Sequence, residues 1–224
     1  HFPPGRAFYS KSSRAHWTEL QQTFPFAGFL AYYEISGDTA YLKLAEGYME
    51  NLYKIQLQWP SRGGFIHNLY AHDPDEGARR NEYGGSPYMT GLLLEPIVRY
   101  HQLTESPKAA DSVFRAVDWV MKDGLNAKGD AIKYLTADKY SGSAGAPDLN
   151  MLVAHVFGYA YKISGYQQQR YRDAGMALLE KGLSSAYLGT RKHFNQAFRS
   201  SAHFLADGAG GVSKEQKIKY PSGE

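Results

Sequence analysis

Apolar residues recur at every third or fourth position along much of the chain, which is the spacing of an amphipathic helix. Two such stripes are Tyr41, Leu44, Ala45, Tyr48, Leu52 and Ile55, and Leu152, Val156, Tyr159 and Ile163. The pattern predicts helices near residues 24–35, 39–56, 87–103, 107–122, 148–163 and 167–183, with a seventh near 192–206. The chain is therefore expected to belong to the all-α class.

Residues that stop and start helices lie between these stripes. Gly37 can adopt the left-handed conformation that ends many helices, and Asp38 can cap the helix that follows. Ser86 and Pro87 fit the N-cap and first positions of the helix near 87–103. Pro96 lies inside that helix, where it removes one backbone hydrogen bond and is expected to kink the helix.

Three segments repeat one pattern, in which an apolar residue and a Ser or Thr precede a short break and a second helical run. They are "YYEISGDTAYLKLAEGYMENL" from Tyr32, "YHQLTESPKAADSVFRAVDWV" from Tyr100 and "AYKISGYQQQRYRDAGMALLE" from Ala160. This repetition predicts an antiparallel helical hairpin used three times. The long connections 57–86 and 124–147 contain the alternating runs "GGFIHNLY" and "AIKYLTA", which predict short β-strands.

The order of helices also predicts where the connections lie. If tight turns join each hairpin at one end of the bundle, then the long connections, residues 184–191 and the N-terminal arm are all expected to emerge at the other end. We divide the chain into an arm at 1–16, a helical domain at 17–207 and a polar tail at 208–224.

Composition narrows the possible functions. The formal charge of +3 and the lack of a Lys/Arg block argue against nucleic acid as a partner. The chain has no Cys, so disulfides and thiolate chemistry are excluded, and no apolar stretch reaches the roughly 20 residues of a membrane span. The 18 Tyr residues suit sugar-binding clefts, other interfaces and half-buried helix faces. Because the chain begins at His1, we expect it to be a processed or excised piece of a longer protein.

The hairpin pattern resembles the α/α toroid proteins of carbohydrate metabolism, which include six-hairpin glycosidases and toroid-type polysaccharide lyases. "SPYMTGLLLEPIVRYHQLTES" resembles their inner helix and turn, and "YYEISGDTAYLKLAEGYMENL" their turn and outer helix. The resemblance covers most of residues 20–185 and matches no catalytic motif residue by residue. A closed toroid of six hairpins needs roughly 300 residues or more, so the resemblance implies a partial α/α toroid that holds part of an active site.

A polysaccharide lyase is one function that this resemblance implies. It would need a group that neutralises the sugar carboxylate, a base and an acid. The sugar carboxylate could be neutralised by Asn68 or Asn81 together with Arg79 or Arg80. The base and the acid could be supplied by His67, His72, Tyr83 or Tyr88. The alternative for the arginines is that they form solvated ion pairs within the loop.

A glycoside hydrolase is the second function that the resemblance implies. It would need two carboxylates that flank the scissile bond. The loop offers Asp73, Asp75, Glu76 and Glu82, with Asp148 as a possible opposite partner. Asp148 equally suits the first turn of a helix. Further residues suited to binding a sugar acid are Lys133, Tyr134, Lys139 and Tyr140.

Metal sites are weakly indicated. "HDPDEG" at 72–77 has several oxygen ligands but lacks EF-hand spacing, and His155 has no sequence partners for zinc. A single His beside an apolar helix stripe is usually a hydrogen-bonded core or boundary residue. We expect no metal ion and no cofactor.

Together these features predict a polysaccharide-processing domain that cleaves or binds an acidic glycan in a cleft formed by the long loops, in a secreted or cell-envelope protein. One alternative is a noncatalytic scaffold or a module that binds a glycan or protein within a larger protein. A third is a structural protein that assembles with copies of itself. The expected partners are therefore a polysaccharide or oligosaccharide and either further domains of the chain or copies of it.

Overall fold

The computed structural model describes residues 17–58, 63–69, 82–137, 145–186, 195 and 198–208. Most of these residues lie in helices, which confirms the all-α prediction. The α-helices are α1 (Glu19–Ser36), α2 (Thr39–Gln58), α4 (Pro87–Thr104), α5 (Pro107–Trp119), α6 (Met151–Ile163), α7 (Gln169–Ser185) and α9 (Ser201–Gly208). The N-terminal arm and residues 209–224 of the predicted tail lie outside the described residues.

Shorter elements complete the described structure. The π-helical turn η3 (Val120–Gly124) extends α5, and the 3₁₀ turn η5 (Pro147–Leu149) precedes α6. Strands β1 (His67–Asn68) and β2 (Tyr83–Gly84) pair antiparallel, with His67 opposite Gly84. The first predicted strand region therefore contains β1. The second, "AIKYLTA", instead forms a single bridge between Ile132 and Leu125.

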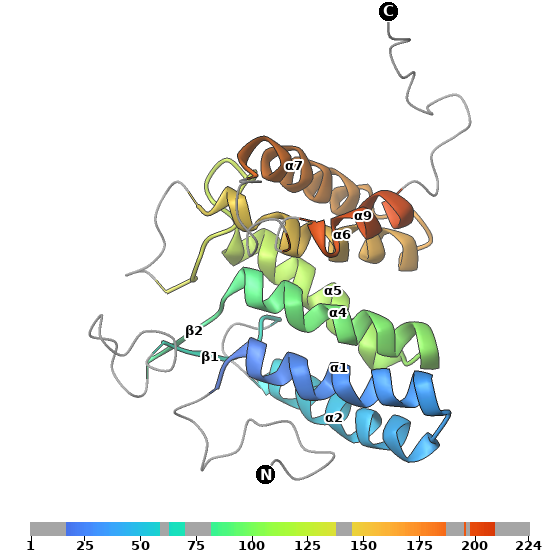
Figure 1. Cartoon of the computed structure of the whole chain (residues 1–224). Helices are drawn as coiled ribbons and strands as arrows, with labels where there is room; N and C mark the ends of the chain where they lie inside the picture. Colours follow the sequence, from blue (N-terminus) through green and yellow to red (C-terminus); the bar gives the residue numbers. More distant parts are fainter. Residues whose placement is uncertain are drawn as a thin grey trace, which may run out of the picture.

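The helices pack as consecutive pairs: α1 on α2, α4 on α5, and α6 on α7. The first helices of the pairs lie side by side, with α4 between α1 and α6, and we call them the α1–α4–α6 row. Figure 1 shows the three pairs one above another, with α9 beside α6. Both β-strands lie near the start of α4 (Figure 1).

Local signals correctly place several helix ends, although the helix predicted near 24–35 begins earlier, at Glu19. Gly37 has φ 71°, and its amide donates to the Tyr33 carbonyl at 2.7 Å, so it ends α1 as predicted. The Asp38 carboxylate accepts from the Ala40 amide at 2.9 Å and so caps α2. Pro87 begins α4, but Ser86 makes no side-chain capping bond, because its hydroxyl donates to the Tyr134 carbonyl at 3.3 Å.

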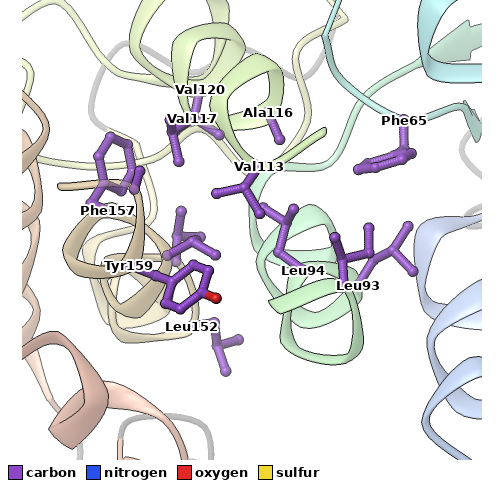
Figure 2. Packing of buried hydrophobic residues seen from close by; sticks show 14 of the residues in the cluster. Phe65, Leu93, Leu94, Val113, Ala116, Val117, Val120, Leu152, Phe157 and Tyr159 are labelled. Atoms are coloured by element: carbon purple, nitrogen blue, oxygen red, sulfur yellow. The ribbon is translucent and has the colours of Figure 1, made fainter. Parts of the chain in front are cut away.

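A continuous apolar core lies between the α1–α4–α6 row and the outer helices. In the region drawn in Figure 2, Leu94 of α4 lies next to Val113 of α5, Leu93 lies on the side of Phe65, and all four are fully buried. Helices α4 and α6 approach closely at Gly91, where a Cβ atom would stand 2.3 Å from the Leu152 carbonyl oxygen. None of the described helices is both long enough and apolar enough to cross a membrane.

Glycine at position 91 is predicted to be required for this close approach. Gly91→Ala forces α4 away from the α6 backbone, and overpacking of this kind lowers the free energy of unfolding by about 1 to 3 kcal/mol. The matched control is Gly28→Ala in α1, where a Cβ would meet nothing within 4 Å. The control is expected to raise stability by up to about 1 kcal/mol, because alanine favours helix. Urea unfolding of both variants checks this, and equal stability of the two would contradict it.

Candidate functional site

The glycine pairs that flank the predicted loop site hold the loop on α5. A Cβ at Gly64 would stand 2.5 Å from the Trp119 indole, and a Cβ at Gly85 would stand 2.4 Å from the same ring. Only glycine lets the backbone lie this close to the indole. Both ends of the long connection are therefore fixed against one side chain of α5, while residues 70–81 between them lie outside the described residues.

A buried carboxylate joins this loop to two helices. Glu19 stands at the start of α1. Its Oε2 atom lies 2.6 Å from the Nδ1 atom of His67, and its Oε1 atom accepts a hydrogen bond from the Ser86 amide at 2.8 Å. Glu19 and His67 are both fully buried. His67, which was predicted to be catalytic, thus lies inside the fold in contact with Glu19. This buried position is typical of a residue that anchors the structure.

The predicted tyrosines lie close to this anchor. Tyr88 is buried and stacks on Tyr134, with ring centroids 5.2 Å apart. Burial raises the pKa of Tyr88 far above its usual value, and Tyr134 raises it further. Tyr83 is half-buried, with its ring 6.2 Å from that of Trp17. Of these residues, Tyr134 is the most exposed, at 41%.

The other predicted site residues are scattered or undescribed. Asn68 is buried, Glu82 is half-buried, Lys133 donates to the Asp123 carbonyl at 3.0 Å, and Asp148 is exposed in η5. Outside the described residues lie His72, Asp73, Asp75, Glu76, Arg79, Arg80, Asn81, Lys139 and Tyr140. The structure therefore brings together His67, Tyr88 and Tyr134 around Ser86 and leaves the rest of the predicted loop site untested.

A cavity of about 430 Å³ lies elsewhere, on the exposed side of the α1–α4–α6 row, and α9 forms its fourth wall. We call it the His155 pocket. Its lining residues are Glu34, Glu95, Val98, Arg99, Gln102, His155, Tyr159, Arg199, Ser200, His203 and Asp207. A second cavity of about 170 Å³ adjoins it and shares Glu95, Arg99 and Arg199.

The His155 side chain is the most unusual group in this pocket. It is 4% exposed, and neither ring nitrogen has a hydrogen-bond partner in the described part of the chain. Burial lowers the pKa of His155 to about 3, and the neighbouring charges of His203 and Arg199 lower it further in the same direction. The imidazole is therefore neutral at physiological pH, and its two buried nitrogens lack a hydrogen-bond partner among the described residues.

Tyr159 lies one helical turn after His155 on α6, so both side chains reach the same pocket. A hydrogen bond of 2.7 Å joins its hydroxyl to the His101 Nδ1 atom. Burial raises the pKa of Tyr159 to about 12, with a smaller contribution from Asp207. Tyr159 therefore keeps its proton at neutral pH and can donate it, while burial lowers the pKa of His101 and favours its neutral ring.

Ion pairs border the pocket. Arg99 of α4 pairs with Glu34 of α1, and Arg199 pairs with Glu95 at 2.7 Å. The hydroxyl of Ser200 also bonds to Glu95. Within the ranges that the structure describes, no group of three or more His, Asp or Glu side chains is placed to hold a metal ion.

Sequence reasoning placed His155 correctly at the core or its boundary but expected a hydrogen bond that the described residues do not supply. It also missed the polar stripe Glu95, Arg99 and Gln102 on α4. The spacing of four and three residues puts these side chains on one helix face, which is detectable from sequence. A polar stripe alone, however, is the ordinary solvent face of a helix.

The anchor at Glu19 leads to a stability prediction. Glu19→Ala leaves the His67 ring and the Ser86 amide buried without this partner, and we expect a loss of about 3 to 5 kcal/mol in the free energy of unfolding. The control is Glu50→Ala, which removes an exposed carboxylate paired with Lys108 at 2.5 Å and should cost at most about 1 kcal/mol. Denaturant unfolding measures both, and a loss at Glu19 no larger than at Glu50 would exclude the anchor.

The pKa of His155 leads to a prediction about acid stability. The folded value is about 3 and the ordinary value is 6.5, so between these pH values the unfolded chain binds the additional proton. Stability therefore falls as pH falls below 6.5, with His155 contributing up to about 1.4 kcal/mol per pH unit. Urea unfolding at pH 7 and pH 5 should show a smaller acid loss for His155→Gln. Val153→Ala, which removes buried packing from the same helix but no titratable group, should keep the wild-type difference.

No protein-family model, curated protein or solved structure matches the chain. The function is therefore inferred from the residues and geometry of the His155 pocket and of the anchored loop.

Proposed function

We propose that the chain is a polysaccharide-processing domain of the α/α toroid type and that it binds an acidic glycan in the His155 pocket. The observation that carries this proposal is the buried His155 ring, which faces a cavity with neither nitrogen bonded within the described part of the chain. Buried polar groups are normally hydrogen-bonded. A ligand rich in hydroxyl groups that enters the cavity and displaces the atoms covering the ring would supply the bond that the described residues do not.

The size and lining of the pocket support a sugar as the ligand. Its volume of about 430 Å³ lies in the range of about 300 to 1,000 Å³ typical of small-molecule sites. The pocket offers an aromatic ring at Tyr159, guanidinium groups at Arg99 and Arg199, and amide and hydroxyl groups at Gln102 and Ser200. This mixture suits both the apolar faces and the polar edges of a sugar ring.

The packing of the helices supports the toroid part of the proposal. Three helix pairs are arranged so that their first helices form one row and carry the pocket on their exposed side. In a toroid this row would correspond to the inner helices. A glycan bound there would extend past the start of α4 toward the long loops, in keeping with a secreted or cell-envelope role.

Cleavage by elimination is a second candidate function, and the state of Tyr159 favours it over hydrolysis. In such a lyase a base removes the proton α to the sugar carboxylate, the C–O bond to the leaving sugar breaks, and an acid protonates the leaving oxygen. Tyr159 is protonated and bonded to His101, which suits the acid role. The pocket carboxylates of Glu34 and Glu95 are each held by an arginine, which disfavours a hydrolytic carboxylate pair.

The proposal predicts saturable binding of acidic oligosaccharides from alginate, pectin or a glycosaminoglycan. His155→Phe fills the pocket with an apolar ring and removes both nitrogens, so we expect at least tenfold weaker binding by calorimetry. Glu50→Gln, on a helix outside the pocket, should bind like the wild type. Lyase activity would appear as ultraviolet absorbance of unsaturated ends, lost in Tyr159→Phe.

Other outcomes separate the remaining alternatives. Binding without unsaturated ends or new reducing ends identifies a noncatalytic binding module. A large species in sedimentation, formed without sugar, favours a self-assembling structural protein. The absence of both binding and turnover across all three polymer classes would refute the glycan proposal.

A further inference from the structure

The fixed charges around the His155 pocket cancel one another among the described residues. Three carboxylates each have one cationic partner. These pairs are Arg99 with Glu34, Arg199 with Glu95 at 2.7 Å, and Lys162 with Asp207 at 2.8 Å. Because each pair sums to zero, this set supplies no net positive charge for an anionic ligand.

His155 lies where an added positive charge would be most effective. Unlike Arg99 and Arg199, whose side chains are 45% and 41% exposed, His155 is shielded from solvent. Charges interact more strongly where water is excluded. Protonation of this one ring would therefore affect a bound anion more than the partly solvated arginines do.

The groups around His155 explain why the ring is neutral in the free protein. Facing the pocket are Glu34 from α1, Glu95 and Arg99 from α4, Tyr159 from α6, and Arg199, Ser200, His203 and Asp207 from α9 and the residues before it. Desolvation is the largest cause of the lowered pKa, and the charges of His203 and Arg199 add to it. Arg199 and His203 also line the pocket, so both would lie close to an anion bound beside His155.

We propose that the carboxylate or sulfate of an acidic sugar binds against His155, beside Arg199 and His203, and that its binding is coupled to protonation of the His155 ring. This inference rests on the proposed glycan function and adds the contact group and its pH dependence. An anion alone would bring one uncompensated negative charge into the balanced pocket. A proton taken from solvent onto His155 restores the balance and gives the buried ring a hydrogen-bond acceptor.

The direction of the pH dependence of anion binding follows from the protonation state of His155 in the free protein. Without ligand, His155 is neutral above its pKa of about 3. A bound anion raises the pKa of the ring, so the complex holds a proton that the free protein lacks. Affinity for the anion therefore increases as pH falls toward the pKa of the free protein, by up to tenfold per pH unit.

The test is calorimetry of a uronate oligosaccharide at several pH values between 5.5 and 7.5, in two buffers of different ionisation heat, with a carboxyl-reduced oligosaccharide and a sulfated one as comparison ligands. We expect net proton uptake with the uronate ligand and tighter binding at lower pH. The carboxyl-reduced ligand should bind more weakly and without proton uptake. The sulfated ligand shows whether the site accepts either oxyanion.

Variants assign the proton to His155. His155→Gln keeps a polar side chain that cannot titrate, so proton uptake should disappear and affinity should fall at low pH. His203→Gln should retain the uptake while weakening binding. If His155→Gln does not fold by circular dichroism, Arg199→Gln provides the second test, because it removes a positive neighbour and should weaken acidic but not carboxyl-reduced ligands.

The outcomes distinguish this inference from the glycan proposal itself. Equal binding of acidic and carboxyl-reduced ligands, or unchanged proton uptake in His155→Gln, would overturn the anion site and leave glycan binding intact. If no glycan binds, nuclear magnetic resonance of the His155 ring during titration with free glucuronate and inorganic sulfate remains decisive. A shift toward the protonated ring supports the anion site, and an unchanged ring overturns it.

Discussion

The buried carboxylate of Glu19 is the interaction on which the arrangement of the first two helix pairs depends. It contacts His67 at 2.6 Å and Ser86 at 2.8 Å, and so joins the starts of α1, β1 and α4. Burying a carboxylate costs several kcal/mol unless its oxygens are paired, so α1 and α4 are held in the register that supplies those partners. At the far end of the same two helices, this alignment lets Glu34 reach Arg99 on the border of the His155 pocket.

Close packing at glycine extends this order to the other helices. Gly91 brings α4 onto α6, and Phe204 of α9 fits against Gly158 of α6 and Gly175 of α7, where added Cβ atoms would collide with its backbone or ring. This contact holds α9 on α6 and places His203 and Arg199 beside His155. The polar wall of the pocket is thus positioned by an adjoining apolar contact of α9.

The His155 pocket combines features that a stability requirement alone would not select. An apolar residue at position 155 would avoid the burial of an imidazole without a partner among the described residues. Instead, a neutral ring lies beside charges that are otherwise balanced in pairs. Such a site responds strongly to an arriving charge, because the surroundings are poorly solvated and a single proton changes the balance.

The sequence by itself determined the helices and their turns, because these depend on neighbours within a few residues. The stripe from Tyr41 to Ile55 and the left-handed glycine at position 37 are local features, and the structure confirms both the helices and the turn. The candidate site could be predicted only in part. His67 lies in a polar stretch that looks like an active-site loop, yet Glu19, 48 residues earlier, buries it as an anchor. His155 lies beside an apolar stripe and looks like a core residue, yet it faces a pocket closed by α9. Arg199 meets Glu95 across 104 residues of sequence. Only the tertiary structure decided which histidine is enclosed by partners and which faces a cavity, because long-range packing and charge, not local spacing, determine the surroundings of a side chain.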